Sequence, residues 1–155
     1  MTMMRFTLNG AAAEADVPEG TSLLHALRGP LGLSGPRFGC GDEKCGSCMV
    51  LVDGVPAFAC TLGTEAVVGR NVLTAEGLGS MAVPHPLQAA MLAEQAGQCG
   101  WCLSGILISA SALLAQNPDP DEDAIRTALE PHLCRCGSHN RIIRAVQRAA
   151  REMRA

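Results

Sequence analysis

Residues 40–48 read Cys40-Gly41-Asp42-Glu43-Lys44-Cys45-Gly46-Ser47-Cys48, so three cysteines stand close together in the spacing C-x4-C-x2-C, and Cys60 follows as a fourth. Sulfurs this close along the chain can converge on one point only if the backbone wraps around that point. Glycine allows the positive φ angles that such wrapping requires. Gly39, Gly41 and Gly46 interleave with these cysteines, and their bare amides could approach the sulfurs and stabilise negative charge. We therefore expect one compact cofactor site here, with the three glycines as part of it.

The spacing of this first set matches the pattern that holds a [2Fe–2S] cluster in plant-type ferredoxins. The expected ligands of a first cluster are Cys40, Cys45, Cys48 and Cys60. A zinc site and a disulfide framework remain as alternatives. Structural zinc usually shows two separate pairs of ligands, whereas a compact triplet followed by one distant cysteine suits a cluster better.

The remaining cysteines form a second set, and none of the eight cysteines is left over. This set consists of two pairs, Cys99-x2-Cys102 and Cys134-x-Cys136. The first pair alone would also fit a thioredoxin-type redox site. Both pairs are expected at the starts of helices, where partial positive charge favours thiolates and an anionic cluster. We therefore expect these residues to hold a second iron–sulfur cluster.

Two histidines near the second set raise the alternative of a Rieske centre, in which histidines replace two of the cysteine ligands. That chemistry would leave two cysteines without a role. His132 and His139 are accordingly expected to be surface or helix-capping residues.

Composition limits what the chain can be. Its 155 residues suffice for one large domain or two small ones. Hydrophobic residues make up 48% of it, although only three are Phe, one is Trp and none is Tyr. The core is therefore expected to consist of small aliphatic side chains, which bury little area each, so that metal binding would add needed stability. The net charge of −3 indicates no nucleic-acid partner.

The sequence also bears on location. No signal peptide precedes the first strand-like segment, and the longest apolar segment, residues 103–115, is too short to span a bilayer. We expect a cytoplasmic protein without a transmembrane segment, with a periplasmic location or membrane association through partner subunits as the alternative. A reducing compartment disfavours disulfides, so paired cysteines there point to metal binding.

The first half of the chain is rich in strand and turn signals. Asn9-Gly10 and Asp53-Gly54 predict two tight hairpins. Thr21 or Ser22 is placed to cap a short helix, which Gly29-Pro30 ends. This half therefore combines strands with one helix.

The second half is helical. Helices are predicted to start at Pro86, after Cys102, with Pro120 as a first helical residue, and near His139, where Cys134-Arg135-Cys136 would open the last one. Four helices with short connections indicate a small bundle. We divide the chain into residues 1–76, a linker at 77–85, and a helical domain at 86–155.

The last predicted helix has two contrasting faces. The basic stripe consists of Arg141, Arg144, Arg148 and Arg151, and the apolar, core-facing stripe of Ile142, Val146, Ala149 and Met153. Two interpretations of the basic stripe are open: it is a solvated face, or it docks on an acidic patch of another subunit, because like charges in one stripe need compensation.

Together, the two cysteine sets resemble those of the small iron–sulfur subunit of the molybdenum hydroxylases, the xanthine oxidase family. The similarity covers nearly the whole chain and rests on residues 39–48, Cys60, and residues 98–102 and 134–136, in that order. It implies an α+β fold with an N-terminal β-grasp plant-type ferredoxin domain followed by a C-terminal four-helix-bundle domain. Each domain would carry one [2Fe–2S] cluster.

The same resemblance implies partners and a route for electrons. A large subunit would hold a molybdopterin (dinucleotide) cofactor, and electrons would pass from the pterin to the helical-domain cluster and then to the ferredoxin-domain cluster. The resemblance places Gln98 against the pterin, with Cys136 beside it; a glutamine offers both donor and acceptor groups to a pterin edge. The alternative for Gln98 is a loop residue that faces solvent. The acceptor would be an FAD-binding medium subunit or a cytochrome c subunit.

The segment Cys134-Arg135-Cys136-Gly137-Ser138-His139 resembles members that oxidise nitrogen heterocycles or aldehydes. No catalytic residue is expected in this chain itself. The expected function is that of the electron-transfer subunit of a molybdenum hydroxylase. The alternatives are a free-standing two-cluster ferredoxin-like carrier and a zinc-dependent interaction module without a redox role.

Overall fold

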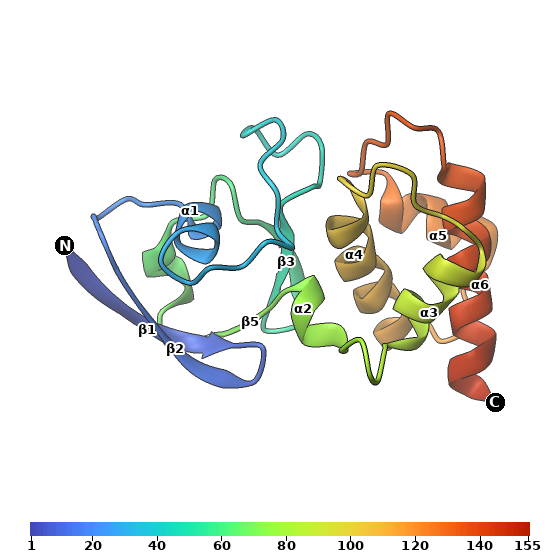
Figure 1. Ribbon diagram of the computed structural model, residues 1–155, viewed down its shortest axis with the longest axis horizontal. Helices are drawn as coiled ribbons and strands as arrows, with labels where there is room; N and C mark the ends of the chain where they lie inside the picture. The colour runs from blue at the N-terminus through green and yellow to red at the C-terminus, as the bar shows by residue number, and fades with distance from the viewer.

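Two tight hairpins and one later strand form a five-stranded sheet in the computed structural model, which describes residues 1–155 (Figure 1). The strands are β1 (Thr2–Leu8), β2 (Ala11–Val17), β3 (Met49–Val52), β4 (Val55–Phe58) and β5 (Asn71–Leu73). Their order is β2-β1-β5-β3-β4, with β1 and β5 parallel and the other neighbours antiparallel. Both hairpins turn at the predicted dipeptides, because Asn9 and Asp53 adopt φ angles of 51° and 49° before a glycine that is also at positive φ.

The short helix α1 (Leu23–Arg28) packs against this sheet. Ser22 caps it by accepting a hydrogen bond from the N–H of His25, which decides between the two predicted caps. The shared core contains Leu23, Leu24 and Leu27 of the helix with Phe6, Val50, Val52 and Val72 of the strands. A helix across a mixed sheet is the predicted β-grasp arrangement. A 3-10 turn, η1 (Thr64–Val67), completes this half.

The strand β3 is buried along its whole length because it has packing partners on both faces. Val50 and Val52 face the core under α1. Met49 and Leu51 instead pack against Ile108 and Ala112 of the second half. This apolar contact joins the sheet to the helices, which lie beside it in Figure 1.

The helical half contains the four predicted helices, α3 (Pro86–Ala93), α4 (Leu103–Gln116), α5 (Glu122–Leu129) and α6 (His139–Arg154). Its core is built from Leu, Ile, Val, Ala and Met side chains, as the composition predicted. His85 caps α3 by accepting from the N–H of Leu87, while the Gln88 side chain accepts from the N–H of His85. None of the helices combines the length and the apolar character needed to cross a bilayer.

Several local predictions were wrong. Residues expected in the linker instead form part of a short helix, α2 (Ala75–Leu78). Asp121 caps α5 by accepting from the N–H of Ala124, so Pro120 precedes the cap and is not the first helical residue. Met153 near the C-terminus is 46% exposed and does not belong to the core-facing stripe.

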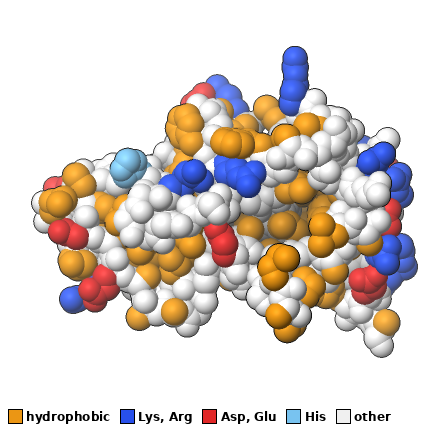
Figure 2. Space-filling model, in the orientation of Figure 1, with side chains coloured by type: hydrophobic (Ala, Val, Ile, Leu, Met, Phe, Trp, Pro, Cys, Tyr) orange, Lys and Arg blue, Asp and Glu red, His pale blue; other side chains and the backbone are white.

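The last cysteine pair does not open a helix either, because α6 begins only at His139, after Ser138. The segment between α2 and α3 protrudes from the molecule with fully exposed Met81 and largely exposed Val83, and hydrophobic side chains gather there in Figure 2.

Candidate metal centres

The first cysteine loop surrounds its sulfurs with backbone amides. The Sγ of Cys40 accepts hydrogen bonds from the N–H groups of Asp42 (3.3 Å) and Lys44 (3.2 Å). The Sγ of Cys45 accepts from the N–H of Cys40 at 3.3 Å. The N–H of Asp42 does most to lower the pKa of Cys40, to about 7, because it stabilises the thiolate. The loop is therefore suited to negatively charged sulfur.

The predicted glycines make this loop possible. Gly41 and Gly46 have φ angles of 69° and 72°, which other residues rarely adopt. A Cβ at Gly39 would lie 2.6 Å from the Sγ of Cys45. Glycine is thus required at each of these positions by conformation or by the approach of the sulfur.

Cys48 and Cys60 complete the first set from the two ends of the β3–β4 hairpin. Their side chains interact directly, as do those of Cys40 and Cys45. Cys48 is buried, and this burial raises its pKa to about 12. A buried thiol becomes a thiolate only when a cation replaces its proton, so this residue suits a metal centre and not a solvent-exposed redox thiol.

The second set comes from two turns that face each other. Cys99 and Cys102 lie in the turn before α4, where Cys102 is the N-cap residue, and the other pair lies in the turn before α6. The Cys99 side chain interacts with that of Cys136, and Cys102 with Cys134. Burial raises the pKa of Cys102 to about 12. The sulfur of Cys99 accepts a hydrogen bond from the N–H of Trp101 at 3.5 Å.

The eight cysteines are free thiols that meet two by two. No group of three or more His, Cys, Asp or Glu side chains is gathered as for a single metal ion. A [2Fe–2S] cluster is wider than one ion and takes four cysteines, hence two for each iron. Two facing pairs in each half therefore fit a two-iron cluster.

The predicted pterin contact, Gln98, lies on the surface beside the second set. Its side chain is exposed, and its Nε2 donates a hydrogen bond to the carbonyl oxygen of Cys136 at 3.3 Å. Gln98 and Cys136 are thus brought together, although they are far apart in sequence.

One hydrogen bond joins the two cysteine sets. The N–H of Leu133 donates to the carbonyl oxygen of Cys45 at 3.1 Å. Leu133 directly precedes Cys134, so a residue of each set lies at one end of this short connection. The sequence offered no sign of it, because the two partners lie in different halves.

His132 lies at the same interface. It is only 5% exposed, which corrects the expectation of a surface or capping residue. Its Nε2 hydrogen-bonds with the hydroxyl of Ser109 at 2.7 Å, and its ring packs against Gly46. Burial lowers the pKa of His132 to about 4, so the ring is neutral at pH 7. His139 is the exposed first residue of α6.

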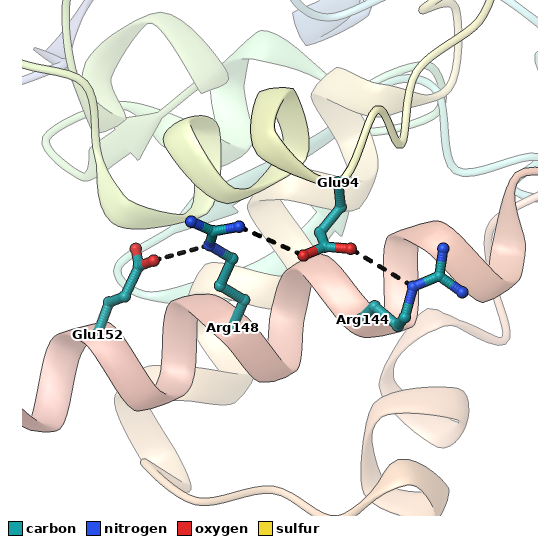
Figure 3. A network of polar contacts seen from close by, with 4 residues as sticks. All are labelled: Glu94, Arg144, Arg148 and Glu152. Atoms are coloured by element: carbon teal, nitrogen blue, oxygen red, sulfur yellow. Dashed lines mark hydrogen bonds and ion pairs between the residues drawn. The ribbon is translucent and has the colours of Figure 1, made fainter.

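The arginines of α6 are largely paired within the chain. Glu94, at the end of α3, lies 3.4 Å from both Arg144 and Arg148, and Arg148 also pairs with Glu152 at 2.8 Å (Figure 3). Arg141 donates to the carbonyl oxygen of Gln95. The charge compensation for which a partner surface was considered is therefore supplied in part by the chain itself.

Two family models cover most of the chain. Residues 6–74 match the model described as a 2Fe-2S iron-sulfur cluster binding domain, and residues 74–147 match the model of a [2Fe-2S] binding domain. One relative is the small nicotinate dehydrogenase component of Pseudomonas putida, which is 46% identical over 99% of this chain and 98% of that protein. The chain belongs to the iron–sulfur subunits of the molybdenum hydroxylase family.

Solved structures agree with this assignment. The quinoline 2-oxidoreductase of Pseudomonas putida 86 contains a chain that is 34% identical and superposes with a TM-score of 0.94, over 99% of this chain and 96% of that one. The aldehyde oxidoreductase of Desulfovibrio desulfuricans matches with a TM-score of 0.96 at 34% identity, but this chain spans only 17% of that longer chain. The predicted α+β fold, the two [2Fe–2S] clusters and the membership of an oxidoreductase complex are confirmed.

Proposed function

We propose that this subunit relays electrons from a molybdopterin site in a large partner subunit, through its two [2Fe–2S] clusters, to a flavin or cytochrome acceptor. The observation that carries the proposal is the hydrogen bond from the Leu133 N–H to the Cys45 carbonyl, because it brings the two cysteine sets together in one interface. A shuttle that carried single electrons in solution would need only one such site. The free-standing two-cluster carrier is the alternative.

Each half supplies its own proposed ligands. Cys40, Cys45, Cys48 and Cys60 would hold the cluster of the first half, and Cys99, Cys102, Cys134 and Cys136 that of the helical half. When bound, each cluster can accept and release one electron. The surrounding amides stabilise the charge of the sulfurs, and the glycines at 39, 41 and 46 let the backbone approach them. We retain the division into residues 1–76, 77–85 and 86–155 as a proposal.

The pterin would approach beside Gln98 and Cys136. The Gln98 amide already donates to the Cys136 carbonyl, and its oxygen remains available to accept from a pterin N–H. Electrons would thus enter at the helical half, and the exposed Cys40 side of the first half would face the acceptor. A reducing, cytoplasmic setting would keep all eight thiols available.

We further propose that the complex oxidises a nitrogen heteroaromatic compound. The nicotinate dehydrogenase component and the quinoline 2-oxidoreductase chain are both similar to this chain over almost their whole length. An aldehyde is the second candidate, from the similarity to aldehyde oxidoreductase. The substrate pocket would lie in the large subunit.

The test is to isolate this chain from its host with whatever copurifies and to analyse the metal content. We expect a red-brown complex that contains a large molybdenum-binding partner, with about four irons and four acid-labile sulfides per copy of this chain, two for each cluster. Nicotinate or quinoline should bleach the clusters more readily than an aldehyde. Stoichiometric zinc without sulfide would contradict the cluster assignment, and a chain that migrates alone on gel filtration would favour the free carrier.

A further inference from the structure

Arg37 reaches from the first half into the cysteine turn of the helical half. Its N–H donates to the carbonyl oxygen of Ser47 at 3.0 Å, which anchors it beside the first cysteine loop. Its Nη1 donates to the carbonyl oxygen of Gly100 at 2.6 Å. Its guanidinium carbon lies 5.3 Å from the ring centre of Trp101, within the range of cation–π attraction. Both partners lie inside the turn between the first two cysteines of the second set.

The peptide group that receives this arginine also serves a cysteine. The Gly100 carbonyl and the Trp101 N–H belong to the same peptide bond, and that N–H donates to the Sγ of Cys99. Hydrogen bonds from ionised donors are stronger than neutral ones, and hydrogen bonds in a chain polarise one another. Arg37 therefore strengthens the positive end of the N–H dipole that faces the Cys99 sulfur.

The charge of Arg37 is also not neutralised locally. Other arginines, such as Arg70, Arg126 and Arg148, lie in ion pairs with carboxylates. The partners of Arg37 are a carbonyl, which carries no net charge, and an aromatic ring. Its side chain is half-buried, so solvent screens it less than a fully exposed cation.

We propose that Arg37 is a positioning residue that raises the reduction potential of the helical-half cluster, acting across the domain interface through the Gly100–Trp101 peptide. The proposal rests on the proposed role of Cys99 as a ligand of that cluster. Reduction adds one negative charge to the cluster, and hydrogen bonds to the sulfurs are among the features that set the potential. A side chain of one half would in this way help to set where an electron rests in the other half.

Arg28 is a matched control. Its Nη1 donates to the carbonyl oxygens of Pro36 (2.8 Å) and Ser34 (3.3 Å), both within the first half. It is therefore an arginine of the same half that binds backbone carbonyls but does not contact the turn of the second set. Its replacement tests whether any nearby positive charge would have the same effect.

The experiment compares Arg37→Gln, Arg37→Lys and Arg28→Gln in the intact complex, by dithionite titration followed by electron paramagnetic resonance. We expect Arg37→Gln to lower the equilibrium constant for reduction of the helical-half cluster about tenfold, which is about 59 mV for a one-electron couple. Arg37→Lys keeps the charge and should retain most of the potential, while Arg28→Gln should leave it unchanged. Iron content and both reduced signals establish separately that the clusters are present.

An unchanged potential of the helical-half cluster in Arg37→Gln would overturn the proposal, as would equal losses in the Gln and Lys variants. If Arg37→Gln does not assemble the cluster, Arg37→Met takes its place, because it is neutral and can still pack on the Trp101 ring. Failure of both neutral variants beside a normally assembled Lys variant would support a requirement for the charge. Failure of all three would show that the side chain only packs there, and would overturn the proposal.

Discussion

At the scale of residues, Gly105 marks the closest approach of α4 to the first cysteine loop. A Cβ at this position would collide with the carbonyl oxygen of Gly46 and would lie 3.3 Å from the ring of His132. Two backbones can therefore meet here only because one residue has no side chain. The ring of His132 fills the remaining space and hydrogen-bonds to Ser109, also on α4.

This packing gives a prediction with an unusual sign. Inside a helix, Gly→Ala normally stabilises a protein by about 0.5–1 kcal/mol. Gly105→Ala should instead destabilise this one by about 1–3 kcal/mol, the range for overpacked sites, because the Gly46 backbone cannot move away without disturbing the cysteine loop. The measurement is the urea concentration at which half of the visible cluster absorption is lost. Ser111→Ala on the same helix is the control, and a more stable Gly105→Ala variant would contradict the packing argument.

Sequence reasoning found the ligand residues but not the contacts between the halves. The cysteines and glycines of the first loop stand next to one another in sequence, so their spacing alone predicts a wrapped loop. His132 was misjudged because its partners, Ser109 and Gly46, are distant in sequence. The hydrogen bond of Arg37 to Gly100 was equally hidden, since nothing local to either residue indicates the other.

At the scale of elements, local chemistry decided which predictions succeeded. The two hairpins were predicted correctly because their turns require positive φ, and Asn-Gly and Asp-Gly supply it. The helix α2 was missed because it is short and contains Gly77. Its Glu76 accepts hydrogen bonds from the N–H of Gly35 (2.6 Å) and from the Thr74 hydroxyl (2.6 Å). Contacts of this kind between distant segments hold a helix that propensity alone would not predict.

The ion-pair network between α3 and α6 gives a second prediction. Glu94→Gln leaves Arg144 and Arg148 without their shared carboxylate. Exposed pairs contribute about 0.2–1 kcal/mol each, so we expect a small loss of stability that shrinks as salt is added. Unfolding in urea at low and high ionic strength measures it. Glu152→Gln removes only a pair within α6 and should cost less.

The same variant tests whether α6 docks on a partner. If the arginines serve mainly Glu94, assembly of the complex should be the same for wild type and Glu94→Gln at every salt concentration. Tighter assembly of Glu94→Gln at low salt, where the released arginines attract a partner most strongly, would instead revive the docking interpretation.

At the scale of the whole molecule, the two halves are separate in sequence but joined by a continuous interface. The sequence predicted the two halves, and the uninterrupted apolar run of β3 now has its explanation, since Met49 and Leu51 face α4. Which residues meet across the interface could not be predicted, because it depends on the placement of one folded unit against another. That interface brings the Cys45 carbonyl to the Leu133 N–H and so sets the two proposed cluster sites side by side.

Removing one ligand from each half tests how far the clusters depend on each other. Cys45→Ser deletes a sulfur of the first set but leaves the backbone carbonyl that binds Leu133, so the interface should persist. We expect this variant to lose the resonance signal of the first cluster and to keep that of the helical half. Substrate should then still reduce the remaining cluster, while electron delivery to the acceptor stops.

Cys102→Ser should have the reverse spectroscopic effect, with loss of the helical-half signal and retention of the other. It should also prevent reduction by substrate of the surviving cluster, because electrons are proposed to enter beside Gln98 and Cys136. The surviving cluster should remain reducible by dithionite, which reaches it without the relay. Loss of both signals in each variant would show that the sites do not assemble independently, and substrate reduction of the first cluster in Cys102→Ser would mean that the proposed order of the two clusters is wrong.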